Sequence, residues 1–166
     1  MLFHMEKQQH HFDYLVYNDI TGLDENDAWL LKEAREVTHH AYAPYSHFQV
    51  GAVIRLVNGE IVAGSNQENA SFPVGLCAER VALSAVSATY PDVAIDTIAV
   101  SYNNLNGDSS RPISPCGICR QTLAEYEYRQ DRPIRLILGG LSGKVYVIDK
   151  ANDLLPLGFS ASDMNE

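Results

Sequence analysis

The chain has 166 residues, of which 46% are hydrophobic and 20% charged, a composition that suits one soluble globular domain and excludes a disordered chain. Its 12 lysines and arginines are outnumbered by 21 aspartates and glutamates, and the net charge of −9 disfavours binding to a nucleic-acid backbone. No apolar run approaches the ~18 residues of a membrane span, and residues 1–18 lack the apolar stretch of a signal peptide. We therefore expect a cytoplasmic protein that binds neither nucleic acid nor membrane.

Residues 1–23 are expected to form an N-terminal extension, and residues 24–166 the folded domain. The extension has no clear hydrophobic period, and residues 1–27 contain one lysine against six acidic residues. This pattern is typical of a solvated or loosely packed segment, with a partner-binding arm as the alternative. The pair His10-His11 has no nearby third ligand, so it does not predict a metal site.

The first predicted elements of the domain are a helix and a hairpin. The helix covers residues 25–41, because apolar residues recur there at helical spacing after the N-cap candidate Asp24. Two strands, residues 49–56 and 60–65, flank the turn Asn58-Gly59, where both residues are expected to have positive φ.

Two further helices and three further strands follow. The order predicted for the chain is α-β-β-α-β-α-β-β, which is typical of a mixed sheet covered by helices. These later elements are a helix over 77–90, a strand over 94–102, a helix opened by Pro115 and reaching 128, and strands over 134–138 and 144–148.

The three cysteines of the chain carry its clearest chemical signal. An odd number of cysteines is a poor disulfide framework, whereas Cys116 and Cys119 form a C-x-x-C pair with Cys77 far upstream. Both groups open predicted helices, whose N-termini lower the pKa of a thiol and favour the thiolate that zinc needs. Three protein ligands would leave the fourth zinc position open for a water, whose pKa bound zinc lowers to about 7.

Glu79 lies two residues after Cys77, which places a carboxylate near such a water. A carboxylate there can take the proton of the water and pass it to a substrate nitrogen. The pattern Cys-x-Glu followed by Pro-Cys-x-x-Cys is the signature of zinc deaminases, in which the glutamate is the acid/base. The alternatives are a structural zinc site with an unseen fourth ligand, a redox dithiol, and an ordinary glutamate in the first turn of a helix.

Six segments occur in one order along almost everything after residue 24. They are AYAPYS at 41–46, FQVGA at 48–52, NQENASF at 66–72, CAER at 77–80, SPCGICRQ at 114–121 and LLPLGF at 154–159. Together they resemble the cytidine deaminase family, in its short zinc-dependent form that assembles as a homotetramer. The resemblance implies a three-layer α/β/α sandwich with a mixed five-stranded sheet. It also implies hydrolysis of cytidine and deoxycytidine to uridine and deoxyuridine with release of ammonia, as in pyrimidine salvage.

The same resemblance assigns roles to individual residues. Cys77, Cys116 and Cys119 would be zinc ligands, Glu79 the proton shuttle, and Arg80 a donor of hydrogen bonds to the ligand sulfurs. The remaining assignments concern the substrate. Asn66 and Glu68 would bind the ribose hydroxyls, Phe48 would lie against the pyrimidine, and the backbone of Ala78 would bind a carbonyl group of the base. Ala70 and Phe72 would be further substrate contacts, and Phe159 would reach the pocket of an adjacent subunit.

Each assignment has a plainer alternative. Asn66 and Glu68 would then only cap their loop, Arg80 would form a surface salt bridge, and Phe159 would pack in the core.

The sequence also departs from the family, which usually has tyrosine where this chain has Phe72, so binding near the ribose 5′ side is in doubt. The extension and the segments 103–111 and 130–132 are longer than usual.

Two other functions stay open. One is deamination of another small aminated nucleoside or a nucleoside antibiotic, although the Asn66-x-Glu68 pair favours a plain nucleoside. The other is a non-catalytic zinc-binding relative, against which the presence of Glu79 argues. A polynucleotide substrate is disfavoured by the net charge of −9.

Overall fold

The computed structural model describes residues 5–164, so the first four residues of the predicted extension and the last two of the predicted domain lie outside the described residues. One mixed sheet has the strand order β1-β6-β5-β4-β2-β3, in which β4 and β5 run parallel and the other neighbours antiparallel. Its strands are β1 (Leu15–Tyr17), β2 (Phe48–Leu56), β3 (Ile61–Ser65), β4 (Ile95–Asn104), β5 (Arg135–Gly139) and β6 (Val145–Ile148).

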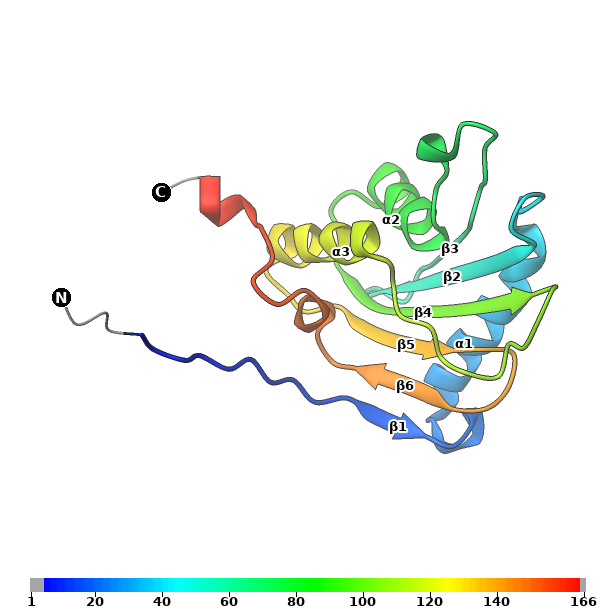
Figure 1. Ribbon diagram of the computed structural model, residues 1–166, viewed down its shortest axis with the longest axis horizontal. Coiled ribbons are helices and arrows are strands. Elements are labelled where there is room, and N and C mark those ends of the chain that lie inside the picture. Colours follow the sequence, from blue (N-terminus) through cyan, green and yellow to red (C-terminus); the bar gives the residue numbers. More distant parts are fainter. Residues whose placement is uncertain (1–4, 165–166) are drawn as a thin grey trace.

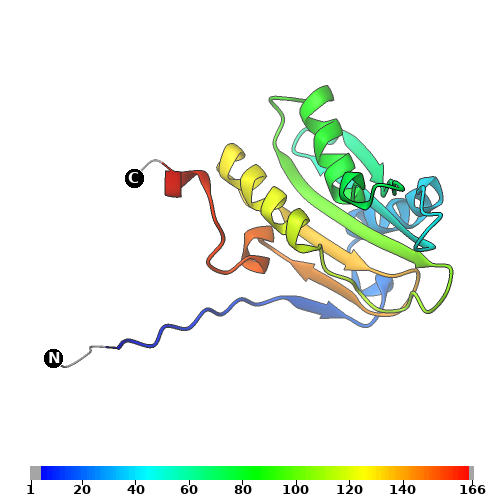
Figure 2. The ribbon, with the colours of Figure 1, turned by 45° about the horizontal axis from the view of Figure 1, so that its top comes forward.

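Helices cover both faces of the sheet, as Figures 1 and 2 show. Helix α1 (Glu25–Val37) packs on one face, and helices α2 (Ala78–Thr89) and α3 (Gly117–Gln130) pack on the other. Residues alternate between the two cores along each strand: Val53, Ala99 and Ile137 contribute to the α1 side, while Ile54, Ile98 and Leu136 contribute to the α2 and α3 side. The predicted three-layer α/β/α sandwich is therefore confirmed. Within residues 5–164, no helix has both the length and the apolar character needed to cross a membrane.

The sheet has six strands, not the five that were predicted, because part of the N-terminal extension joins it. Strand β1 pairs antiparallel with β6, with Leu15 opposite Val147 and Tyr17 opposite Val145. Tyr17 also packs against the core on the α1 side. A strand of three residues is too short to give a readable alternation in the sequence. By contrast, residues 5–14 are exposed and form no helix or strand, and the Tyr14 ring packs on Tyr146 of β6, with ring centroids 5.1 Å apart (Figure 1).

Some element boundaries differ from the predicted ones for local reasons. Helix α1 ends at Val37 and continues as a 3₁₀ turn over Thr38–His40, whereas the prediction ran to residue 41. In the β2–β3 turn only Gly59 has positive φ, at 89°, so the expectation for Asn58 was wrong. The Asn58 side chain instead accepts a hydrogen bond from the Glu60 N–H at 3.1 Å. The loop is longer than a two-residue turn, and it is closed by a 2.9 Å hydrogen bond from the Leu56 N–H to the Glu60 carbonyl.

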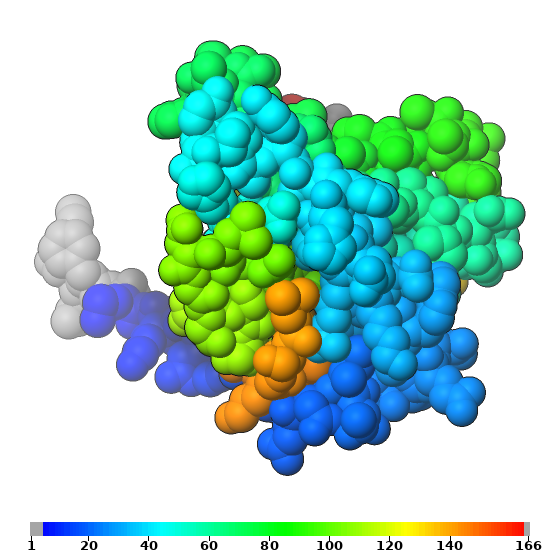
Figure 3. All heavy atoms as spheres, turned by 90° about the vertical axis from the view of Figure 1, so that its right-hand side faces the viewer, coloured from blue at the N-terminus to red at the C-terminus, as the bar shows by residue number. Residues whose placement is uncertain are grey.

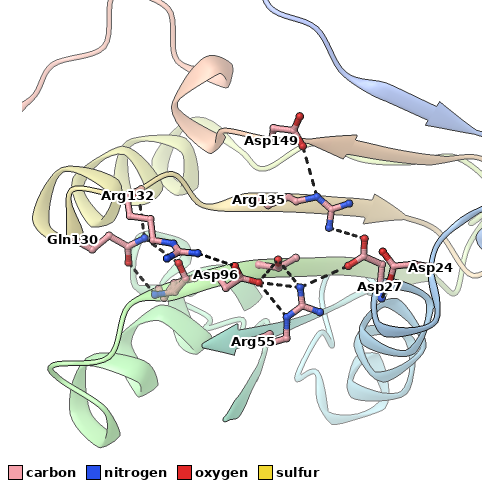
Figure 4. A network of polar contacts seen from close by, with 10 residues as sticks. Asp24, Asp27, Arg55, Asp96, Gln130, Arg132, Arg135 and Asp149 are labelled. Atoms are coloured by element: carbon pink, nitrogen blue, oxygen red, sulfur yellow. Dashed lines mark hydrogen bonds and ion pairs between the residues drawn. The ribbon is translucent and has the colours of Figure 1, made fainter. Parts of the chain in front are cut away.

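An ion-pair network fixes the start of α1 on the sheet (Figure 4). Asp27 is buried in the first turn of α1 and lies 2.6 Å from the Arg135 guanidinium on β5. Arg55 on β2 bonds Asp96 on β4 at 2.9 Å and lies 3.8 Å from Asp27. Because a buried carboxylate is costly without cationic partners, this network makes one position of α1 strongly preferred.

Candidate active site

The structure brings the three cysteines together at the starts of α2 and α3. Cys77 is the N-cap residue of α2, Cys116 is the N-cap residue of α3, and Cys119 lies in the first turn of α3. The Sγ atoms of Cys77 and Cys116 are 3.6 Å apart, those of Cys116 and Cys119 are 3.5 Å apart, and all three lie within 4.8 Å of one another. Pro115 precedes the N-cap, so the expectation that it is the first helical residue was wrong.

These three thiols fit a zinc ion. Tetrahedral ligands at the Zn–S distance of about 2.3 Å stand about 3.8 Å apart, close to the separations found here. The thiol of Cys119 donates a hydrogen bond that lowers the pKa of Cys77 to about 6, and Cys116 and the charge of Arg80 act in the same direction. Unpaired N–H groups at two helix starts further favour thiolates. Among the described residues no fourth histidine, cysteine or carboxylate joins this group, so three thiolates would leave one tetrahedral position free.

A close approach of α2 to β3 holds Cys77 in this place. A Cβ atom at Gly64 on β3 would lie 2.4 Å from the backbone nitrogen of Ala82 and 2.7 Å from the carbonyl oxygen of Ala78. Both atoms belong to the backbone of α2, so they cannot yield as a flexible side chain would. Only glycine lets the first turn of α2 approach the sheet this closely.

Glu79 is buried beside the cysteines, with 5% of its surface exposed. Burial raises the pKa of its carboxyl group, while hydrogen bonds from its own backbone N–H and the Cys119 thiol act in the opposite direction. A carboxyl group in this setting can hold a proton during a reaction, which an exposed glutamate does poorly at neutral pH.

These groups open into a cavity of about 700 Å³. In Figure 3 the segment near residue 45 (cyan) lies between the loop near residue 70 (green) and the loop near residue 107 (yellow-green). Backbone hydrogen bonds join these segments: Glu68 N–H to the Tyr42 carbonyl at 2.8 Å, and Leu105 N–H to the His47 carbonyl at 2.9 Å. The cavity is lined by residues 45, 46, 48, 50, 66–69, 72, 75–79, 113, 114 and 116.

Asn66 and Phe48 form one unit in the cavity wall. The Oδ1 atom of Asn66 accepts from the Val50 N–H at 2.7 Å, and its Nδ2 donates to the Phe48 carbonyl at 2.9 Å. The Phe48 ring stacks on Tyr102, with ring centroids 4.9 Å apart and planes 12° apart. Asn66 therefore fixes the backbone on both sides of Gln49, while Tyr102 supports the ring that lines the cavity.

Glu68 holds the end of the AYAPYS segment in place. Its Oε2 atom accepts from the N–H groups of Tyr45 at 2.9 Å and Ser46 at 3.3 Å. Desolvation is the largest single influence and works against ionisation, but the hydroxyl of Ser46, these two N–H groups and the charge of His47 together lower the pKa of Glu68. Sequence reasoning assigned no role to Tyr45 or Ser46, and their place in a recognised segment was the only signal that could have found them.

The other predicted substrate contacts divide into two groups. Ala78 lines the cavity, and Phe72 stands at its rim, 74% exposed and 5.7 Å from the Tyr45 ring centroid. Ala70 does not line this cavity within the described residues, and neither does Phe159, which is 59% exposed. Such exposure argues against core packing for Phe159. Arg80 acts on Cys77 through its charge, and its hydrogen bonds to the ligand sulfurs stay a prediction.

Several known proteins are similar to this chain. Residues 24–131 match the family described as the cytidine and deoxycytidylate deaminase zinc-binding region. The cytidine deaminase of Halalkalibacterium halodurans is 39% identical over 137 residues, which are 82% of this chain and 96% of that protein. The cytidine deaminase of Mycoplasma genitalium is 36% identical over 137 residues, 82% of this chain and 98% of that protein. The blasticidin-S deaminase of Bacillus cereus is 32% identical over 143 residues, 84% of this chain and 96% of that protein.

Solved structures show the same likeness. The crystal structure of cytidine deaminase from Burkholderia pseudomallei has a TM-score of 0.66 and 37% identity, and the match covers 79% of this chain and 97% of that chain. The structure of cytidine deaminase from Mycobacterium leprae has a TM-score of 0.60 and 34% identity, covering 80% and 99%.

Proposed function

Because this chain belongs to the family of cytidine and deoxycytidylate deaminases, we propose that it binds zinc through Cys77, Cys116 and Cys119 and hydrolyses both cytidine and deoxycytidine. The observation that carries the proposal is the buried Glu79 carboxyl group beside three clustered thiols in one cavity. A structural zinc site or a redox dithiol would have no use for that carboxyl group. The products would be uridine or deoxyuridine and ammonia, as pyrimidine salvage requires.

The division of labour follows from what each group can do. Zinc held by three thiolates would supply a water activated for attack at neutral pH. Glu79 would take a proton from the attacking water and deliver it on the nitrogen side of the pyrimidine. A C–O bond forms at the aminated carbon, the C–N bond breaks, and the amino group leaves as ammonia. Asn66 and Tyr102 would keep the Phe48 ring fixed against the base throughout.

The charge of the cavity favours a nucleoside over its 5′-phosphate. Among the described residues, the lining contains the carboxylates Glu68 and Glu79 but no lysine, arginine or histidine. The two helix starts in this cavity carry the thiols, no cationic side chain of the described lining stands ready to pair with a phosphate, and two nearby carboxylates would repel it. Glu68, kept ionised by its N–H partners, is instead suited to accept hydrogen bonds from ribose hydroxyls.

A second candidate substrate is a nucleoside antibiotic. The 32% identity to a blasticidin-S deaminase favours it, together with the exposed phenyl ring of Phe72 at the rim where the family usually has a phenol. An apolar rim tolerates a larger group in place of the ribose 5′ hydroxyl. The Asn66-x-Glu68 pair still makes the plain nucleoside the first choice.

An ultraviolet assay with four substrates separates these functions. We expect loss of absorbance with cytidine and deoxycytidine, little with deoxycytidylate, and less with blasticidin S than with cytidine. Removal of metal by a chelator should abolish turnover, and zinc should restore it. Zinc-loaded protein that leaves all four compounds unchanged would contradict the proposed enzyme and favour a non-catalytic zinc-binding relative.

We also propose that the chain forms a homotetramer in which Phe159 closes the cavity of a neighbouring subunit. The support is that Phe159 is 59% exposed and does not line the cavity of its own chain within the described residues. A closed homo-oligomer can supply the missing wall and exclude water. We further propose a cytoplasmic location, because three free thiols persist in a reducing compartment.

A further inference from the structure

Two neighbouring residues of α3 hold the C-terminal segment that carries Phe159. The Arg120 guanidinium donates through Nη1 to the Leu154 carbonyl at 2.9 Å and through Nε to the Pro115 carbonyl at 2.9 Å. Gln121 donates through Nε2 to the Phe159 carbonyl at 2.8 Å. Both residues directly follow Cys119, so they extend from the same helical turn as the thiol cluster.

The chain between these two anchors lies on the surface. Leu154 is 7% exposed, whereas Leu157 is fully exposed and has a φ of 56°, a left-handed conformation unusual for leucine. Apolar packing therefore does little to direct residues 155–159. Hydrogen bonds therefore direct Phe159 more than apolar packing does. Gly158 N–H donates to the Leu155 carbonyl at 3.1 Å and Ser160 N–H to Asp163 at 2.7 Å, and both bonds are local, whereas the Gln121 bond ties Phe159 itself to α3.

We propose that Gln121 is a positioning residue that orients Phe159 toward the neighbouring cavity, with Arg120 fixing the other end of the segment. This inference rests on the proposed function, in which Phe159 covers the pocket of an adjacent subunit. In this arrangement α3 contributes to two pockets. Its first turn carries Cys119 of the pocket in its own subunit, and Gln121 in the same helix orients Phe159, which covers the pocket of the adjacent subunit.

The direct test is Gln121→Glu, which keeps the size and helical preference of the side chain but replaces the N–H donor with a second acceptor. Loss of one hydrogen bond to the cover should raise KM for cytidine about three- to tenfold. We expect kcat to change less than KM and zinc content to stay the same. Amide hydrogen exchange in residues 155–160, which needs no substrate, should become several-fold faster. Unchanged exchange in that segment would overturn the proposal even if no substrate were known.

Gln130→Glu is the matched control, because it makes the same chemical change on the same helix. Gln130 donates to the carbonyls of Ile95 and Arg132, at 3.0 Å each, and these lie in the body of the domain. This variant should lower Tm without raising KM or the exchange of residues 155–160. If both variants raise KM alike, Gln121 has only a general structural role.

A double-variant cycle with Phe159→Ala asks whether Gln121 acts through the ring. In the Phe159→Ala background, Gln121→Glu should have no further effect on KM, because the group it positions is gone. Full additivity would contradict the proposal.

Mixed oligomers test whether the effect crosses the subunit interface. We would dissociate and reassemble Gln121→Glu chains with an excess of catalytically inactive Glu79→Gln chains. Active pockets then have an intact Glu79 from one chain and an intact Gln121 from its neighbour, and their KM should return to that of the unmodified protein. A KM that stays high in the mixture would place the effect within one chain. An unmodified protein active on cytidine, together with an unchanged KM for Gln121→Glu, would reject this inference and leave the proposed function intact.

Discussion

The backbone N–H of Tyr45 donates a 2.9 Å hydrogen bond to the carboxylate of Glu68, so one acidic side chain both faces the cavity and fixes its wall. Under the proposed function, Glu68 would contribute twice to binding. It would offer an acceptor to the substrate, and it holds the loop around Tyr45 in place before a substrate arrives. Preorganisation of this kind reduces the entropy lost on binding.

Glu68→Ala should accordingly raise KM for cytidine by at least tenfold while zinc content stays fixed. The reason is that removing an interaction made equally in the ground and transition states changes KM rather than kcat. Glu68→Gln retains an acceptor and should have a smaller effect. Steady-state kinetics with metal analysis would check both variants. An unchanged KM for the alanine variant would mean that the loop over residues 66–72 has been misassigned.

The pH dependence of KM should reflect the same group. The pKa of Glu68 is lowered from its usual 4.5, so its ionised form stabilises the loop above that value, and the stabilisation is lost as the pH falls through the lowered pKa. In the unmodified protein KM should therefore rise at acid pH, and in Glu68→Gln this rise should be smaller. A titration between pH 3 and 7 under conditions where the fold persists would test the expectation. An identical acid limb in both proteins would contradict it.

Glu79→Gln should retain zinc and lose turnover. The amide is nearly the same size as the carboxyl group but cannot carry a proton, and acid/base catalysis alone contributes about 10²–10⁴-fold. Elemental analysis and kcat on cytidine are the measurements. Near-normal turnover in a zinc-loaded variant would remove Glu79 from the mechanism.

Gly64→Ala should weaken zinc binding by displacing α2, because Gly64 lies where α2 packs against β3. The new Cβ would meet the α2 backbone at 2.4 Å, so the helix must shift and move Cys77 away from the other thiols. We expect a loss of about 1–3 kcal/mol in the free energy of unfolding together with faster loss of zinc to a chelator. The exposed neighbour Ala63→Ser is the control. Equal zinc retention in the two variants would show that α2 tolerates the shift.

Phe159→Ala should weaken substrate binding without loss of zinc, because the ring lies outside its own cavity. Dissociating and reassembling it with Glu79→Gln should restore some activity, since a mixed pocket can take Glu79 from one chain and Phe159 from the other. Light scattering should report about four chains per particle. A fully active monomer would refute the role of Phe159 in a neighbouring subunit.

The sequence predicted what depends on local rules. Helix starts are determined within a few residues, so Cys77 and Cys116 could be placed at two N-termini, and their meeting in space follows from the sheet that joins the helices. The recognised segments contain most of the cavity lining, although the sequence analysis assigned a role to only some of these residues. The pairing of β1 was missed, because three residues give no periodic signal. The partners of Glu68 and Gln121 were missed because they lie 23 and 38 residues away in the chain.

The pairing of Leu15 with Val147 also gives the N-terminal extension a protective role. Without β1, the backbone N–H and C=O groups of β6 would form an open edge, next to the valines and isoleucine of a strand that is otherwise largely buried. Unpaired edges of this kind recruit strands from other molecules. Removing the chain up to and including residue 17 would thus turn a paired edge of the sheet into a template for aggregation, while the cavity lined by β2 and the starts of α2 and α3 would keep all its lining residues.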